Sequence, residues 1–407
     1  MGFNPLQEKG IPIDKQLGSW SELNVKPYNK RSVHPYTRAR VILMNGIEVE
    51  GALFSHQFAR HCDHPEIKGR LALIRRLEQQ QQKIVNWLIP ADENPLEVTI
   101  GYEQVAVDLT AWVARHEPDP YLRQVYEFGL LEDFDHLYRY SNLYEYLEDG
   151  DARDIVGDRT EVMPGRPTVL EHRNPFDDIR KHYGKATVDP VSRLHALTVT
   201  AAEQQTMNFY MNVGNRHPDP LSRSLYQEIA QIEEQHVTQY ECMLDPLESW
   251  FQQLLFHEYN ECFLYHSMMQ QETDPGIERI FQRHLEMEIG HLHAAEEMLL
   301  KYEGIEAGEI LPKSLPQEIV FEPNKDYLRD VLTRTVRWQS LGTDLMPFDQ
   351  LPKDAPYHTY QKTVNDGQKF VPSEKVVDHL RAKKGRDYRL ESEGPHPIGF
   401  LQQQPQP

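Results

Sequence analysis

The stretch "EMEIGHLHAAEE", residues 286–297, places two groups that are costly to bury on what reads as the buried face of a helix. Glu288 and His291 are three residues apart, so both point to the same side of a helix. Apolar residues surround them at helical spacing: Ile277, Phe281, Leu285, Leu292, Ala295 and Leu299. A carboxylate and an imidazole are stable in such a core only with a partner, and the pattern favours metal ions.

Predicted helix starts recur along the chain, each at a proline preceded by His, Asp or Asn. Proline suits the first helical turn, where its missing N–H needs no partner, and Asp is a good cap. Amphipathic runs follow these prolines and predict helices over 36–61, 65–88, 95–115, 120–147, 190–213, 220–243, 246–271 and 275–302. The helix over 246–271 is expected to open at Asp245-Pro246. Strand-type alternation is nearly absent, so the predicted fold class is all-α.

The positions of the carboxylates indicate an internal duplication. Six of the helices carry a carboxylate thirteen residues after their proline, at Glu48, Glu78, Asp133, Glu203, Glu233 and Glu288. A shift of 155 residues superimposes the two halves, and it also carries Glu103 onto Glu258 and His136 onto His291. A shift of 55 residues relates the two helical hairpins inside each half. The elementary unit is therefore predicted to be a hairpin that occurs four times.

This repeat predicts two helical domains joined and flanked by irregular segments. The expected parts are an N-terminal arm (1–33), a first bundle (34–147), a connector (148–189), a second bundle (190–303) and a C-terminal arm (304–407). The segments outside the helices are rich in Pro, Gly and charge. We expect extended arms that wrap the helices or a partner subunit of a homodimer, with a frayed end at "LQQQPQP".

Composition excludes several classes of function. The formal net charge of −20 argues against binding to nucleic acid or to anionic lipid. No apolar run approaches the roughly 20 residues of a spanning helix, and "MGFNPLQEKG" has no signal-peptide core, so a cytoplasmic protein without membrane contact is expected. The three cysteines form no C-x-x-C pair. A disulfide framework and a rubredoxin-type iron centre are thus excluded, and a metal must be held by oxygen and nitrogen.

The second half carries a complete set of such donors. Each Glu-x-x-His presents one carboxylate and one imidazole to the same point of a helix face, and the two other helices add a Glu each. The predicted metal ligands there are Glu203, Glu233, His236, Glu258, Glu288 and His291. Hard carboxylate oxygens that bridge two ions, with one imidazole on each, suit iron or manganese better than zinc.

One Glu from each of two helices plus Glu-x-x-His from each of the other two resembles the ferritin-like di-iron carboxylate proteins. The resemblance implies two tandem ferritin-like four-helix bundles and two iron ions, or manganese, in the second half. It also singles out Glu261, three residues after Glu258, because rubrerythrin-like members carry an extra carboxylate at that place. The alternative for Glu261 is a solvated charge on the helix surface.

The first half departs from the pattern. Its corresponding set is Glu48, Glu78-x-x-Gln81, Glu103 and Asp133-x-x-His136. Gln81 offers only a neutral carbonyl oxygen in place of an imidazole. The first half therefore holds either a second, weaker dinuclear site or a decayed site that is kept for packing.

The turn at Cys242–Asp245 is short, whereas ferritin-like bundles join their hairpins by a long crossover. Two groupings of the ligands follow, and we favour the one in which each half keeps its own. In the other, the ligands of 103–136 join those of 203–236, and Glu48, Glu78 and Gln81 meet Glu258, Glu288 and His291.

Two tyrosines are candidate catalytic residues beside Glu261. Tyr210 and Tyr265 lie seven residues after Glu203 and Glu258, on the same helix faces, where a phenol can stabilise a reacting group or carry a radical. Ordinary core packing is the alternative for both.

The expected function is that of an O₂-using di-iron oxygenase or oxidase. The resemblance implies hydroxylation, N-oxygenation or desaturation of a small molecule as a monooxygenase-type reaction, with electrons from an external donor because no flavin or ferredoxin motif is present. The alternatives are a rubrerythrin-like peroxidase, which Glu261 favours, and a non-catalytic iron- or manganese-binding helical protein. The sequence does not identify the substrate.

Overall fold

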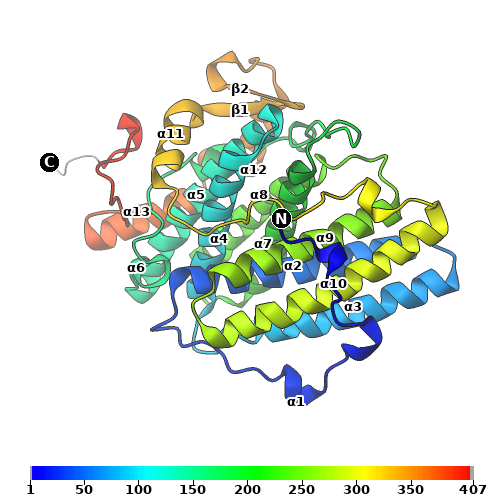
Figure 1. Ribbon diagram of the computed structural model, residues 1–407. Helices are drawn as coiled ribbons and strands as arrows, with labels where there is room; N and C mark the ends of the chain where they lie inside the picture. Colours follow the sequence, from blue (N-terminus) through cyan, green and yellow to red (C-terminus); the bar gives the residue numbers. More distant parts are fainter. Residues whose placement is uncertain (1, 404–407) are drawn as a thin grey trace. The chain divides into compact units, whose positions relative to one another are not determined.

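The computed structural model describes residues 2–403 of the chain, and it is mostly helical, as predicted (Figure 1). Within these residues the named strands are a single hairpin, β1 and β2, in which Trp338 pairs with Pro347 and Leu341 with Asp344. None of the described helices is long and apolar enough to cross a membrane. The last four residues of the predicted C-terminal arm, 404–407, lie outside the described part.

The chain forms two compact units, and neither unit is one continuous half of the sequence. Unit 1 comprises residues 1–92, 183–205 and 244–320, and unit 2 comprises residues 93–182, 206–243 and 321–407. The predicted grouping of the helices into 34–147 and 190–303 is therefore wrong. The predicted repeat of one hairpin along the chain is compatible with either pairing, so it did not decide between them.

Unit 1 is built around four long helices that contact one another in a ring. Helix α2 packs on α3 and α9, and α10 packs on α9 and α3 (Figure 1). The helices of unit 1 are α1 (Trp20–Leu23), α2 (Pro35–Arg60), α3 (Pro65–Asn86), α9 (Trp250–Gln271) and α10 (Pro275–Glu303). Helix α7 (Pro190–Val213) contributes residues 190–205 to unit 1 and residues 206–213 to unit 2.

Unit 2 centres on α5, which contacts α4, α8, α11 and α13. Its elements are α4 (Pro95–His116), α5 (Pro120–Glu148), α6 (Arg153–Val156), α8 (Pro220–Glu241), α11 (Lys325–Thr335), β1 (Trp338–Leu341), β2 (Asp344–Pro347), α12 (Pro356–Val364) and α13 (Pro372–Lys384). Short 3-10 turns occur in the chain at Pro5–Gln7, Ile13–Lys15, Thr168–Leu170, Pro175–Asp177, Gly214–Arg216, Ala307–Glu309, Phe348–Gln350, Asp366–Gln368 and Gly399–Leu401.

The predicted helix starts are confirmed at seven of the eight sites. Asp119 accepts hydrogen bonds from the N–H groups of the first turn of α5, Asp219 does so for α8, and Asp274 for α10. The start at Asp245-Pro246 is wrong, because α9 begins at Trp250 behind a capping box formed by Ser249 and Gln252. Asp245 instead accepts a hydrogen bond from the Leu247 N–H at 2.8 Å and closes the preceding turn.

The expected extended C-terminal arm is also wrong for much of its length. Helices α11, α12 and α13 form there, and α13 packs on α5 and α8. Two of these helices begin with a proline at the first helical position, Pro356 and Pro372. A proline also begins the earlier helices, but here Ala355 and Val371 stand in place of the preceding His, Asp or Asn, so only the proline part of that signal is present.

The N-terminal segment lies along α10 without forming a long helix. The Ile11 N–H donates to the Glu286 carbonyl at 2.7 Å, and the Gln16 side-chain amide donates to the Met287 carbonyl at 2.9 Å. This approach is possible because α10 has Gly290 at the crossing, where a Cβ would lie only 2.0 Å from the Ile11 carbonyl oxygen. The segment thereby brings Gln16 to the side of His291.

Replacing Gly290 with alanine is expected to push residues 11–16 away from α10, because backbone cannot yield as a side chain does. The segment should become sensitive to limited proteolysis, and the melting temperature should fall. Gly69→Ala on α3 is the matched control, since its Cβ meets nothing within 4 Å and the change should stabilise the helix by about 0.5–1 kcal/mol. Equal protease resistance of both variants would contradict this packing.

Candidate metal centres

The four helices of unit 1 bring together seven of the conspicuous polar residues. This group, named here the unit-1 cluster, consists of Glu48 on α2, Glu78 and Gln81 on α3, Glu258 and Glu261 on α9, and Glu288 and His291 on α10. All seven are at most 2% exposed. The ligand atoms of Glu78, Glu258 and His291 lie within 4.8 Å of one another, and so do those of Glu48, Glu261 and Glu288.

The unit-1 cluster holds five carboxylates and one imidazole. The hydrogen bonds within the cluster do not compensate the negative charge that these carboxylates carry when ionised. His291 Nδ1 lies 2.9 Å from Glu288 Oε2 and 3.7 Å from Glu258 Oε2. Within residues 2–403, one carboxylate oxygen each of Glu48, Glu78, Glu258 and Glu261 has no hydrogen-bond partner. Unpaired oxygens that converge in a dry core fit hard divalent cations.

The pKa values of these carboxyl groups reflect the same burial and mutual repulsion. Burial, followed by the charge of Glu288, raises the pKa of Glu48 and of Glu261 well above the usual range. Burial and neighbouring carboxylates do the same for Glu258. Burial raises the pKa of Glu78 to about 7, even though His291 opposes the shift. Without cations, these four carboxyl groups therefore keep their protons to higher pH in the folded chain than in the unfolded chain.

Glu261 belongs to the cluster and is not a solvated surface charge. Its neighbour across the cluster is Gly51 of α2, where a Cβ would lie 2.6 Å from Glu261 Oε1. The missing side chain leaves the space that the Glu261 carboxylate fills. The pairing of a glycine on α2 with an extra glutamate on α9 was not visible from the spacing of either residue.

Unit 2 gathers a second set, named here the unit-2 cluster, from α4, α5 and α8. The ligand atoms of Glu103, His136 and Glu233 lie within 4.8 Å of one another, and those of Asp133, Glu233 and His236 do likewise. All five residues are at most 1% exposed. Burial alone raises the pKa of Glu233, but the hydrogen bonds with His136 and His236 hold it well below its usual range.

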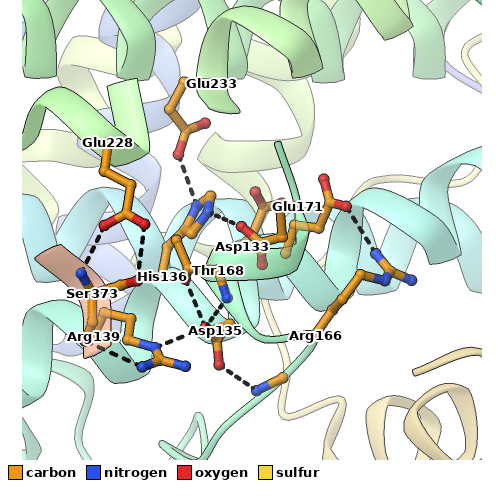
Figure 2. A network of polar contacts seen from close by, with 12 residues as sticks. Asp133, Asp135, His136, Arg139, Arg166, Thr168, Glu171, Glu228, Glu233 and Ser373 are labelled. Atoms are coloured by element: carbon orange, nitrogen blue, oxygen red, sulfur yellow. Dashed lines mark hydrogen bonds and ion pairs between the residues drawn. The ribbon is translucent and has the colours of Figure 1, made fainter. Parts of the chain in front are cut away.

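Each imidazole of the unit-2 cluster is held from behind by a carboxylate that the sequence analysis missed. Figure 2 shows His136 between two carboxylates, with Nδ1 at 3.0 Å from Glu233 and Nε2 at 2.8 Å from Glu171. His236 places Nε2 at 2.9 Å from Glu132 and Nδ1 at 3.2 Å from Asp133. Because Nε2 of each ring has an outer carboxylate as its partner, Nδ1 is the atom that faces the cluster, where a cation can take the place of its proton.

Buried arginines keep the outer carboxylate Glu132 charged. Arg173 Nη1 lies 2.5 Å from Glu132 Oε1, and Arg166 Nη1 lies 3.1 Å from the same oxygen. Burial alone raises the pKa of Glu132, but these guanidinium groups and His236 hold it well below its usual range. Glu132 therefore accepts a hydrogen bond from His236 Nε2 and stays ionised.

Glu171 reaches the cluster because the connector is tied down on α5. Asp135 accepts hydrogen bonds from the Gly165 N–H at 2.9 Å and from the Thr168 N–H at 2.8 Å (Figure 2). Gly165 is needed at this crossing, since a Cβ there would lie 2.2 Å from the Leu131 carbonyl oxygen. No periodic pattern marks Glu171 or Arg173 in the sequence, because the connector is irregular.

The unit-1 cluster holds its imidazole in the same manner with an amide instead of a carboxylate. His291 Nε2 lies 2.7 Å from Gln16 Oε1, and Nδ1 faces the carboxylates. Gln81 stands where a second imidazole would complete the set, and its amide donates to Glu288. Gln16 was also missed, since it comes from the N-terminal segment.

The structure thus realises the alternative grouping, and the predicted pairing of ligands within each half is wrong. Glu48, Glu78 and Gln81 meet Glu258, Glu288 and His291 in unit 1, while Glu103, Asp133 and His136 join Glu233 and His236 in unit 2. Glu203 is buried on α7, two helical turns before Tyr210 on the same face, and stays a predicted ligand.

Both candidate tyrosines contact a cluster carboxylate. The Tyr265 hydroxyl donates to Glu48, and the Tyr210 hydroxyl donates to Glu103. Both side chains are at most 1% exposed. Each tyrosine therefore orients one carboxylate of its cluster, in addition to packing in the core.

No protein-family model, curated protein or solved structure matches this chain.

The metal-free protein is expected to lose stability as pH rises. The unfolded chain releases the proton of Glu78 at pH values around 4.5, whereas the folded chain keeps it to about pH 7. The free energy of unfolding therefore falls across that window. In metal-loaded protein the trend should reverse, because protons compete with cations for the carboxylates. Thermal unfolding by circular dichroism between pH 5 and 7, with and without chelator, measures this, and parallel curves would contradict it.

The outer carboxylate of His136 is expected to matter for metal affinity. Glu171→Ala should weaken metal binding at the unit-2 cluster by about 10- to 100-fold, because the imidazole loses the acceptor that fixes its tautomer. Glu171→Gln keeps an acceptor oxygen and serves as the matched control. Competition with a chelator, in a His291→Ala background that disables the unit-1 cluster, measures the affinity. Unchanged affinity in the alanine variant would show that Glu171 is only a packing residue.

Proposed function

We propose that the chain is a ferritin-like non-haem dinuclear iron enzyme that uses O₂ to oxidise a small organic molecule. One observation carries the proposal. Three buried imidazoles, His136, His236 and His291, turn Nδ1 toward converging carboxylates while an outer acceptor holds Nε2. Metal-ligating histidines almost always have this arrangement, in which one ring nitrogen faces the metal and the other donates to an outer acceptor.

The donor set supports iron or manganese as the metal. Carboxylate oxygens dominate both clusters, and imidazole nitrogen is the other donor, which excludes sites that select for thiolate. Two divalent cations would bring four positive charges to the five carboxylates of the unit-1 cluster and nearly neutralise them. In our proposal each unit is a ferritin-like four-helix bundle, and the alternating hairpins are an internal duplication.

When bound, a pair of ferrous ions supplies the reduction of O₂ coupled to the oxidation of an organic substrate, with further electrons from an external donor. The protein residues would bind the ions, orient the ligands and exclude water. In unit 1, Glu48, Glu78, Glu258, Glu288 and His291 are the proposed ligands. Tyr265 donates to Glu48 and fixes its carboxylate, and the buried walls keep the cluster dry.

Glu261 supports a second candidate function, a rubrerythrin-like peroxidase. The group is buried in the unit-1 cluster beside Glu48 and Glu288, as an additional carboxylate of such a centre would be. Peroxide would then replace O₂ as the oxidant, and the proposed ligands would remain the same.

Protein loaded anaerobically with Fe(II) is expected to consume O₂ when reduced. His291→Ala should lower the rate by about tenfold or more, because the unit-1 cluster loses its only imidazole. His293→Ala is the matched control on the same helix, since His293 is partly exposed and contacts Glu296 and the Glu8 carbonyl. An oxygen electrode measures the rate.

The same reduced protein should be mixed with H₂O₂ in a stopped-flow instrument. Faster oxidation by H₂O₂ than by O₂, lost in Glu261→Gln, would select the peroxidase. Iron-loaded wild type that reacts with neither oxidant would refute both functions.

A further inference from the structure

A small cavity lies directly beside the unit-1 cluster. Its volume is about 200 Å³, and its walls come from the N-terminal segment, α3 and α10. Ligand pockets for drug-sized molecules measure about 300–1,000 Å³, so this cavity suits a smaller molecule.

Three residues that line the cavity are hydrogen-bonded to a proposed metal ligand, two directly and one through Tyr265. Gln16 accepts the hydrogen bond of His291 Nε2 at 2.7 Å. Gln81 donates to Glu288. His284 Nδ1 lies 2.9 Å from the hydroxyl of Tyr265, which in turn donates to Glu48. A molecule in the cavity is therefore separated from the cluster by single side chains.

His284 lines this cavity and has one buried ring nitrogen without a hydrogen-bond partner in the described part of the chain. When Glu48 is ionised, as it would be on a metal ion, it accepts the single proton of the Tyr265 hydroxyl, so His284 Nδ1 carries the proton between His284 and Tyr265. Nε2 then keeps a lone pair, and it has no partner among residues 2–403. The side chain is 1% exposed. Burial lowers the pKa of His284 to about 3, so the ring stays neutral.

The other walls define what such a molecule looks like. Leu23, Val25, Ile84, Ile280 and Met287 provide apolar surface. The charged walls, Glu22 and Arg283, are exposed and of opposite sign, so they select for neither an anion nor a cation. The buried part of the cavity therefore combines apolar contacts with one hydrogen-bond acceptor.

We propose that this cavity binds the substrate of the unit-1 cluster, a small, neutral and largely apolar organic molecule whose hydroxyl or amine group donates to His284 Nε2. Only the word substrate rests on the proposed function, because binding to the cavity needs no oxidation. The hydrogen bond anchors the polar end, and the apolar body packs against α3 and α10.

Phenol and toluene are matched probes, since they share a ring and differ in the donor. Saturation-transfer NMR on the full chain loaded with diamagnetic Zn(II), which keeps Glu48 ionised, measures both affinities. Phenol should bind about fivefold or more tightly than toluene, the ratio expected of one net hydrogen bond. Equal affinities would overturn the role of His284.

Variants locate the binding site. His284→Phe should remove the preference for phenol while toluene still binds, and Ile84→Trp should fill the cavity and weaken both. Leu73→Trp, on the exposed side of the same helix α3, is the control and should leave both affinities unchanged. Unchanged phenol binding in Ile84→Trp would overturn the proposal.

Loading the full chain with Mn(II) tests the proximity of the cavity to the cluster. Bound phenol should then show strong paramagnetic line broadening, which Ile84→Trp should abolish. Binding without broadening would place phenol away from the metal and overturn its assignment as substrate. If phenol binds and broadens as expected but Fe(II)-loaded protein consumes no oxidant, the cavity stands and the proposed oxidation fails.

Discussion

The repulsion among carboxylates in a dry core is the constraint on which the rest of the structure depends. The unit-1 cluster places Glu48, Glu78, Glu258, Glu261 and Glu288 in a space that water does not reach. Taken out of water without counter-charge, each such group costs several kcal/mol. Helices of ordinary sequence would not tolerate this cost. The residues around the cluster are consistent with cation binding. Gly51 leaves room for the Glu261 carboxylate, and Gln16 orients the imidazole of His291.

The sequence predicts the helices and the inward-facing ligands because both follow local rules. A proline at the first helical position and a carboxylate thirteen residues later place Glu48, Glu78, Asp133, Glu233 and Glu288 at one depth, and the structure buries all of them. The C-terminal helices carry only the proline of this signal, at Pro356 and Pro372, with no capping side chain before it. Their ranges lay within a Pro- and Gly-rich stretch whose composition indicated an arm, and composition there was the weaker guide.

The grouping of the helices could not be predicted from the repeat. Under the predicted fourfold repeat, the hairpin α2–α3 is as compatible with α4–α5 as with α9–α10. The residues behind the ligands were out of reach for a different reason. Gln16, Glu132 and Glu171 act through the outer nitrogen of an imidazole, and two of them lie in irregular segments where no spacing rule applies.

The two clusters differ in their donor groups. The unit-2 cluster has two imidazoles, each backed by a carboxylate that raises its strength as a donor. The unit-1 cluster has one imidazole, a neutral amide at Gln81 and a cavity at its side. The unit-1 cluster therefore relies more on carboxylate oxygen, and the unit-2 cluster relies more on imidazole nitrogen.

The most direct test of the central claim is anomalous X-ray scattering from crystals of the protein grown with Mn(II). The account predicts a pair of anomalous peaks among the carboxylates of the unit-1 cluster next to His291, and peaks at His136 and His236 in unit 2. Peaks confined to exposed acidic residues, with both clusters lacking metal at saturating Mn(II), would contradict it.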